Sequence, residues 1–196
     1  TKLADMRHRS LEKKVMKTAD SLVTVTWNWG EEMEEIRNSK VRVITNGYDP
    51  EDFSEAHGKQ GDVFNIIHAG SLNRDRNPDS FWKALSRLIE ENPEIKDKLR
   101  LDLIGPVDYS VNQSLEKYEL TKYLNRIESL PHAEVIRKMM DASLLLLPLN
   151  NTPNISGVVP GKLYEYIGSG RPIIAIGNTQ GDSARIMNET SAGLIS

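Results

Sequence analysis

The residues best suited to chemistry gather on one predicted helix that begins at Pro160. Leu163 and Ile167 lie four positions apart and are expected to face the core. Lys162 and Glu165 lie three positions apart on a different face, so Glu165 points towards solvent or a cleft. A helix that follows glycine and serine offers free backbone N–H groups and the positive end of its dipole, which together bind phosphate. Lys162 would add a full positive charge, and the alternative for Glu165 is a solvated side chain without a function.

Two common nucleotide-binding motifs are not met by this sequence. Residues 68–73 contain one glycine instead of the three of G-x-G-x-x-G, which removes the main support for a nicotinamide-dependent dehydrogenase. Residues 157–163 resemble a Walker loop, but only three residues separate the two glycines, and Leu163 stands where the Mg²⁺-binding hydroxyl belongs. A P-loop ATPase is therefore not expected.

Strand and helix patterns alternate from residue 63 to the end. The predicted strands are 63–68, 99–104, 126–129, 143–148 and 173–176, and the predicted helices are 79–91, 113–123, a helix after 131, 160–167 and 181–188. Such an alternation implies βαβ units, hence an α/β fold with an open, doubly wound parallel sheet. Ligands bind at the carboxyl ends of the strands in these sheets. The loops to search are 69–77, 105–111, 129–131, 149–161 and 177–181.

The apolar face of the helix predicted at 79–91 is expected to contain Phe81, Leu85, Leu88 and Ile89. The continuous leucine run at 144–147 is typical of a central strand that is covered on both faces.

The first 48 residues predict a partial second α/β unit. Its elements are a helix over Leu11, Val15 and Ala19, a buried strand at 22–26, an acidic helix at 30–37, and a strand at 41–44 closed by an Asn46-Gly47 turn. Residues 49–62 are polar and without periodicity, which is typical of a linker. We therefore expect one domain at 1–48, a linker at 49–62 and a second domain at 63–196.

Composition and charge exclude several classes of protein. The 196 residues contain no cysteine, which removes disulfide scaffolds, zinc ribbons and thiol nucleophiles, and the four histidines are dispersed. A net charge of −3 argues against general nucleic-acid binding. The first 17 residues are the exception, with six Lys or Arg against two acidic residues. We interpret them as a solvated helix face, and the alternatives are a membrane-surface or nucleic-acid patch.

Four segments together resemble the retaining family 4 glycosyltransferases of the GT-B fold. They are Pro160-Gly161-Lys162 with residues 165–174, residues 43–49 with Phe53, residues 67–72 followed by Arg76, and residues 103–106. They follow the order and spacing of the family, so the resemblance extends from about Leu11 to the C-terminus. It implies the Rossmann-like, donor-binding C-terminal domain of such an enzyme, preceded by the last elements of its N-terminal domain.

The resemblance also implies a site for a nucleoside diphosphate sugar. Glu165 would bind the ribose hydroxyls, and Arg76 or Arg74, assisted by Lys162, would offset the diphosphate charge. The family's usual Arg and Lys spacing is not kept, and Gly157 stands where the family has a glutamate that contacts the sugar. The expected catalytic residues are Arg76 and Lys162, and the other expected donor contacts are Gly70, Ser71, Arg74, Ser129, Leu130, Asn154, Ser156, Gly157, Gly161 and Glu165.

By this resemblance the parent protein transfers a sugar to a glycan or lipid-linked acceptor, as in surface polysaccharide biosynthesis. The sequence has no Asp-x-Asp triplet, so no metal cofactor is expected. The parent is expected to be cytoplasmic, with peripheral membrane contact. The chain is expected to be a fragment that binds nucleotide and does not catalyse by itself. The alternatives are a GT-B sugar-nucleotide 2-epimerase and a binding module that has lost catalysis, to which Gly157 lends weight.

Overall fold

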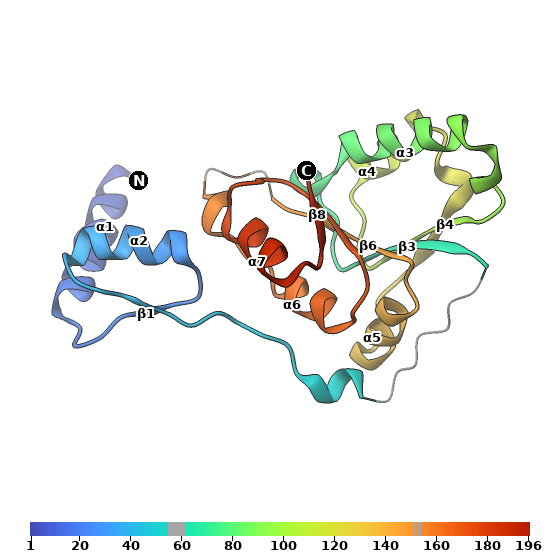
Figure 1. The fold of residues 1–196 in the computed structure, drawn as a ribbon. Helices are drawn as coiled ribbons and strands as arrows, with labels where there is room; N and C mark the ends of the chain where they lie inside the picture. Colours follow the sequence, from blue (N-terminus) through green and yellow to red (C-terminus); the bar gives the residue numbers. More distant parts are fainter. Residues whose placement is uncertain (55–61, 151, 153) are drawn as a thin grey trace.

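The computed structural model describes residues 1–54, 62–150, 152 and 154–196 (Figure 1). Its main feature is a six-stranded parallel sheet in the order β5-β4-β3-β6-β7-β8. The strands are β3 (Phe64–Ala69), β4 (Leu99–Ile104), β5 (Leu124–Ile127), β6 (Leu144–Pro148), β7 (Ile173–Ile176) and β8 (Gly193–Ile195). The chain runs outward from β3 to β5 and returns to β6 on the other side of β3. The predicted doubly wound sheet is confirmed, and its topological switch lies between β3 and β6.

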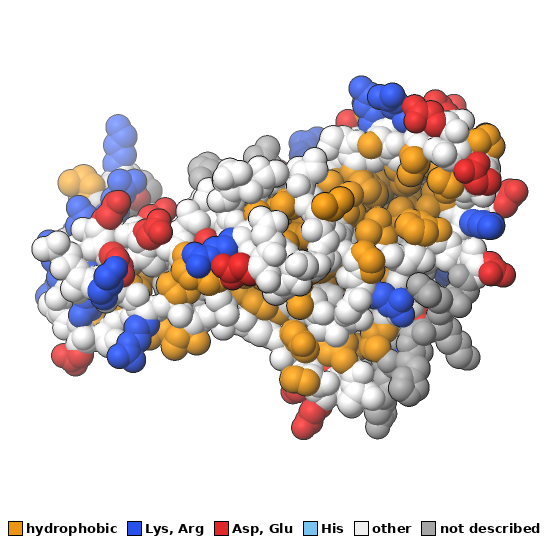
Figure 2. Space-filling model, in the orientation of Figure 1, with side chains coloured by type: hydrophobic (Ala, Val, Ile, Leu, Met, Phe, Trp, Pro, Cys, Tyr) orange, Lys and Arg blue, Asp and Glu red, His pale blue; other side chains and the backbone are white. Residues whose placement is uncertain are grey.

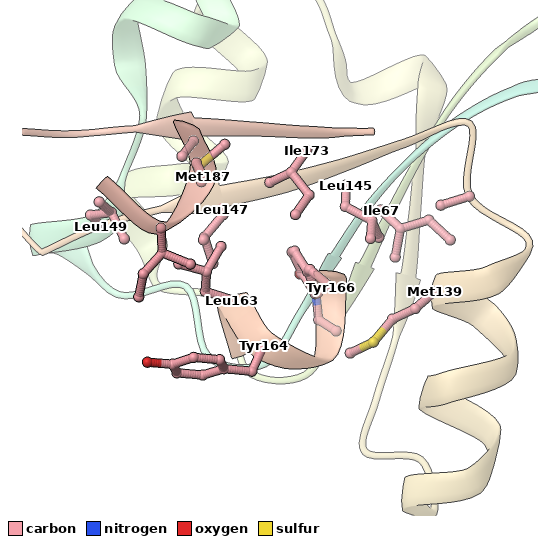
Figure 3. Close-up of a cluster of buried hydrophobic side chains, with 14 of the residues drawn as sticks. Ile67, Met139, Leu145, Leu147, Leu149, Leu163, Tyr164, Tyr166, Ile173 and Met187 are labelled. Carbon is pink, nitrogen blue, oxygen red and sulfur yellow. The ribbon is translucent and has the colours of Figure 1, made fainter. Parts of the chain in front are cut away.

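Helices cover both faces of this sheet. One face carries α3 (Asp79–Glu91) and α4 (Tyr109–Lys117), and the other carries α5 (His132–Met140), α6 (Gly161–Gly168) and α7 (Asp182–Thr190). The leucine run of β6 contributes to the core on both faces of the sheet. Leu145 and Leu147 pack towards α6 and α7 (Figure 3). Leu146 packs towards α3. The prediction of a central strand covered on both sides is therefore confirmed.

Several boundaries differ from prediction for local reasons. Helix α4 begins at Tyr109, four residues before the predicted start, because the Asp108 carboxylate accepts the Ser110 N–H at 2.8 Å and caps the helix. It ends at Lys117, and Glu119 adopts a left-handed φ of 55°. The prediction that Leu88 faces the core from α3 was wrong.

Leu88 is 46% exposed, whereas Trp82 on α3 is fully buried and donates its indole N–H to Asn77 Oδ1 at 2.9 Å. The strand predicted at 126–129 lies two residues earlier in the structure, at Leu124–Ile127.

The N-terminal unit consists of α1 (Lys2–Thr18), β1 (Val23–Thr24), α2 (Trp27–Arg37) and β2 (Arg42–Val43), with β1 and β2 paired in parallel. Its elements match the prediction in kind, but α2 begins three residues earlier. Only Thr24 of the two β1 residues is buried. Figure 2 shows several basic side chains on this unit, interspersed with acidic and hydrophobic ones, and α1 has no buried residue. Within the described ranges, no helix is long and apolar enough to cross a membrane.

The predicted Asn46-Gly47 turn was wrong, because residues 44–49 form no turn. The rings of Tyr48 and Phe53 meet edge to face, with centroids 5.4 Å apart, and both lie against Gly168 on α6. The beginning of the predicted linker, a 3-10 turn at Pro50–Phe53, packs on α5, and His132 Nε2 lies 3.1 Å from Asp52 Oδ2. Residues 55–61 of the linker lie outside the described residues, and the domain boundaries remain predictions.

A buried histidine on β3 makes the stability of the fold sensitive to acid. His68 is 1% exposed, its Nδ1 lies 3.0 Å from the Leu146 carbonyl oxygen, and its Nε2 has no hydrogen-bond partner among the described residues. Burial, with a smaller contribution from the Lys162 charge, lowers the pKa of His68 to about 4. The unfolded chain therefore takes up a proton near pH 6.5, before the folded chain does.

We expect the histidine contribution to the free energy of unfolding to be intact above pH 6.5 and to fall as the pH drops towards 4. Between pH 7 and pH 5 the loss should be roughly 2 kcal/mol. Urea unfolding at several pH values measures this contribution in the wild type and in His68→Gln. Both proteins contain the same carboxylates, so the difference in their pH dependence is due to His68. Equal pH dependence in the two proteins would contradict the prediction.

Candidate functional site

A cavity of about 230 Å³ lies where the carboxyl ends of β3, β4 and β5 meet α6. Five of the residues predicted from the sequence line it together: Gly70, Ser129, Leu130, Lys162 and Glu165. They come from the ends of β3 and β5 and from α6, and the parallel register of β3, β4 and β5 brings these strand ends to a single edge. This edge is where the doubly wound topology predicts a ligand.

Two glycines shape the floor of the cavity. Gly70 and Gly105 follow β3 and β4, and both have a φ of +108°, a conformation that favours glycine. A Cβ atom on Gly105 would lie 3.1 Å from the Gly70 carbonyl carbon and oxygen. A Cβ atom on Gly70 would lie 2.1 Å from Lys162 Nζ. The Lys162 ammonium group therefore rests against bare backbone at the end of β3.

Tyr166 fixes α6 to the sheet edge. Its side chain is fully buried, its hydroxyl accepts the Ala69 N–H at 2.9 Å, and it donates to the Leu146 carbonyl at 3.5 Å. Burial raises the pKa of the Tyr166 hydroxyl, which keeps it neutral. Leu163 is also fully buried and Ile167 partly so, as predicted (Figure 3). Lys162 and Glu165 lie on the part of α6 that faces the cavity.

The charges at this edge suit an anion. Burial, followed by the nearby Arg76 charge, lowers the pKa of Lys162 to about 8, and Glu165 opposes this shift. No described carboxylate forms a salt bridge with either Lys162 or Arg76. Two neighbouring cations without an ion-pair partner favour a ligand that carries more than one negative charge.

The structure separates the two candidate arginines of the first loop. Arg76 acts on Lys162 through its charge and donates its Nε–H to Asn150 Oδ1. It also lines a second cavity of about 560 Å³, between the start of α3 and the carboxyl ends of β6 and β7. Arg74 is exposed and lines neither cavity. Its charge acts instead on Asp108, whose pKa is lowered mainly by a hydrogen bond from Ser110. Arg76 is thus the arginine that can share an anion with Lys162.

Four other predicted contacts lie outside the smaller cavity. Ser71 is exposed beside it, and exposed Asn154 accepts a hydrogen bond from the Thr152 hydroxyl at 2.9 Å. Ser156 accepts one from the Asn178 side chain at 2.9 Å. Gly157 is buried, in a 3-10 turn at Ile155–Gly157. The geometry thus assigns these residues to the loop before α6 or to the rim, and not to the cavity wall.

Gly161, the first residue of α6, faces open space: no described atom lies within 4 Å of the position that a Cβ would take. The helix has no side-chain cap at Pro160. The Leu163 N–H donates to the Pro160 carbonyl at 3.0 Å, so the N–H groups of Gly161 and Lys162 are the ones that can meet an anion.

Sequence reasoning missed three features of this region. Trp29 of α2 lies against Gly157, so closely that a Cβ there would be 2.4 Å from the indole ring. Val135 and Met139 of α5 form an apolar wall of the cavity. Tyr166 holds the helix that carries the charged residues. The i, i+4 apolar spacing of Val135 and Met139 was visible in the sequence, whereas the other two contacts join segments far apart in the chain.

The residues that the structure describes form no metal-binding site. No group of three or more His, Cys, Asp or Glu side chains among them could hold an ion.

Comparison with solved structures establishes the fold. An α,α-trehalose-phosphate synthase (UDP-forming) from Burkholderia vietnamiensis matches with a TM-score of 0.70 at 10% identity, over 94% of this chain and 49% of that one. Sucrose-phosphate synthase from Thermosynechococcus elongatus gives 0.68 at 15% identity, over 95% and 47%. WaaG, a glycosyltransferase involved in lipopolysaccharide biosynthesis, gives 0.65 at 15%, over 89% and 48%.

The fold is therefore the Rossmann-like α/β arrangement of GT-B glycosyltransferases, and the chain spans about half the length of these proteins. No family model and no curated protein sequence matches the chain.

Proposed function

We propose that the chain is the donor-binding half of a glycosyltransferase that uses a nucleoside diphosphate sugar. The observation that carries this proposal is the position of the Lys162 ammonium group, which lies against the backbone of Gly70. The charge of Arg76 acts on this group from nearby, and Glu165 lines the same cavity. The cations suit a diphosphate, and the carboxylate suits a pair of hydroxyl groups. The fold shared with a UDP-forming synthase supports the same reading.

Each group has a distinct role in the proposed reaction. The bond between the anomeric carbon and the β-phosphate oxygen breaks, and a bond forms from that carbon to the oxygen of an acceptor hydroxyl. The proton of this hydroxyl passes to the departing diphosphate. Lys162, Arg76 and the first N–H groups of α6 stabilise the negative charge that grows on the departing diphosphate. Glu165 accepts hydrogen bonds from the ribose hydroxyls. Ser129 and Leu130, at the end of β5, hold the base.

The proposal also covers the stereochemistry, the acceptor and the membrane contact of the parent protein. We infer that transfer retains the anomeric configuration, as the resemblance to family 4 suggests. The acceptor would be a glycan or lipid-linked sugar in surface polysaccharide synthesis, bound mainly by elements outside this chain. Peripheral membrane contact through the basic helix α1 is a further part of the proposal.

Replacing Glu165 with alanine should weaken nucleotide binding without unfolding the chain. The side chain lies off the buried Leu163 face of α6, so its loss removes ribose hydrogen bonds and no core packing. We expect a loss of about 1.5 to 3 kcal/mol in binding free energy, with Glu165→Gln intermediate because its amide oxygen still accepts one bond. Calorimetry with UDP and GDP measures this, and exposed Glu116→Ala on α4 is the matched control. Unchanged affinity in Glu165→Ala would remove it from the site.

We propose that no divalent metal is needed to hold the diphosphate. Lys162, Arg76 and the N-terminus of α6 provide the positive charge that an ion would otherwise supply. Titrations in Mg²⁺, Mn²⁺ and EDTA should therefore give similar affinities. Binding that is lost in EDTA and restored by Mn²⁺ would show that the phosphates are neutralised in another way.

A non-catalytic binding module is the second candidate, favoured by one observation. No carboxylate can project from position 157, where the Trp29 ring takes the space. The epimerase reading has less support, because none of the described residues that line the cavity is a histidine. Labelled UDP- and GDP-sugars incubated with the full-length parent separate the three: transfer indicates the transferase, 2-epimer formation the epimerase, and binding without turnover the module.

A further inference from the structure

A buried carboxylate outside the cavity joins the two parts of the chain. Asp182 is the first residue of α7 and is 2% exposed. Its Oδ2 accepts the backbone N–H of Asn28 at 2.9 Å, and its Oδ1 accepts the Asn28 side-chain amide at 2.8 Å. Asn28 belongs to the first turn of α2 in the N-terminal unit, which lies beside the loop before α6 (Figure 1). One side chain thus fixes the beginning of a helix on the other unit.

Helix α2 depends on this contact because it has no cap of its own. Thr26 stands at the N-cap position, but its buried hydroxyl has no hydrogen-bond partner among the described residues. The first N–H groups of a helix need acceptors, and the helix dipole favours a negative charge there. Asp182 supplies both the acceptor and the charge from another helix.

The same segment around the start of α7 also holds the loop that leads into α6. The Ser183 hydroxyl donates to the Val158 carbonyl at 2.8 Å. The Asn178 amide, in the loop before α7, donates to the Ser156 hydroxyl at 2.9 Å. The loop at 155–158 is therefore attached on one side to the residues that surround Asp182.

Helix α2 holds that loop on its other side. The Trp29 ring lies against Gly157, and the Arg185 guanidinium stacks on the Trp27 ring at 3.9 Å from its centroid. Both tryptophans flank Asn28 in the sequence, so the hydrogen bonds to Asp182 fix the turn that carries them. The first turn of α2, the start of α7 and the loop at 155–158 form one joint.

We propose that Asp182 is a positioning residue for the donor site. It holds the first turn of α2 on the loop at 155–158, so that Trp29 closes over Gly157 and the loop enters α6 at a fixed angle beside Lys162. The part of this inference that concerns the donor rests on the proposed function. Because the loop is the segment expected to meet the sugar, loosening it should weaken binding of the nucleotide sugar more than that of the nucleoside diphosphate.

The joint itself can be tested without any ligand. The sequence has no cysteine, so cysteines introduced at exposed Lys13 on α1 and Glu116 on α4 accept spin labels without background. We expect a narrow distance distribution in the labelled chain and a broad or displaced one in Asp182→Ala. Asp182→Asn should keep most of the narrow distribution, because its amide oxygen can still accept the Asn28 N–H. Asn28→Ala, which removes only the side-chain bond, should lie between the two.

Asp102 provides the matched control. It is a fully buried carboxylate on β4, held by Arg100 and two asparagines within the sheet. Asp102→Ala should lower stability and leave the label distance unchanged. An unchanged distribution in Asp182→Ala, or equal broadening in both alanine variants, would overturn the inference.

Ligand binding supplies the second readout. In Asp182→Ala we expect affinity for the matching nucleotide sugar to fall about tenfold, and affinity for the nucleoside diphosphate to change less than about twofold. Equal losses for the two ligands would overturn the positioning role. If the wild type binds no nucleotide, the proposed function fails, and the label distances still decide whether Asp182 holds the joint.

Discussion

Replacing Lys162 with methionine is expected to lower nucleoside diphosphate affinity by roughly 30- to 150-fold, and transfer by the full-length parent by about 100- to 1000-fold. Methionine keeps much of the apolar stem and removes the charge, so the contact with Gly70 is kept while the diphosphate loses its nearest cation. The larger effect on transfer follows because negative charge on the diphosphate increases as the sugar departs. Calorimetry and a transfer assay measure the two effects.

The pH dependence of binding identifies the lysine responsible. Since the pKa of Lys162 is lowered to about 8, the unliganded chain loses this charge above pH 8. Wild-type affinity should fall roughly twofold between pH 7 and pH 8 and more steeply above pH 8, whereas Lys162→Met should show no such fall. Exposed Lys83 on α3 is the control, and Lys83→Met should behave as wild type. A fall that persists in Lys162→Met would place the titrating group elsewhere.

Replacing Gly105 with alanine is expected to destabilise the chain by roughly 2 to 5 kcal/mol. The residue has a φ of +108°, and its new Cβ would press on the Gly70 carbonyl, which belongs to rigid backbone. Backbone strain contributes about 1 to 3 kcal/mol and overpacking a similar amount. Gly70→Ala carries the same strain, but its Cβ meets the movable end of Lys162.

Gly70→Ala should therefore cost less stability than Gly105→Ala, and it should lower nucleotide affinity by about tenfold because it displaces the ammonium group. Urea unfolding and calorimetry on the two variants measure both quantities. Loss of less than about 1 kcal/mol in Gly105→Ala, or wild-type nucleotide affinity in Gly70→Ala, would show that the two strand ends do not approach as described.

The parallel sheet could be predicted from the sequence because its strands and helices carry strong local patterns. β4 and α3 were placed at their observed bounds, since each pattern is clear over several residues. The start of α4 was misplaced because the capping side chain of Asp108 outweighed the apolar spacing. The Asn46-Gly47 pair did not turn, because the ring contact of Tyr48 with Phe53 carries the chain onto α6. A local cap thus set the first boundary, whereas tertiary packing overrode the local turn preference at the second place.

The candidate site divides in the same way. Helical spacing placed Lys162 and Glu165 off the core-facing side of their helix, whereas the expected roles of Glu165 and Gly70 came from the resemblance to the family 4 glycosyltransferases. The choice between Arg74 and Arg76 needed the structure, because the two side chains differ in what surrounds them and not in local pattern. The Trp29 contact with Gly157 and the Asn28 bonds to Asp182 join segments far apart in the chain, and no periodicity reports such pairs.

Amide chemical shifts recorded while the chain is titrated with UDP and GDP test the central claim most directly. If the edge formed by β3, β4 and α6 binds a nucleoside diphosphate, the largest shifts for the nucleotide that binds should fall on Gly70, Gly105, Gly161 and Lys162, and Lys162→Met should abolish most of them. Saturable shifts confined to the larger cavity beside Asn178, or no shifts with any nucleoside diphosphate, would contradict the assignment of this edge as the donor site.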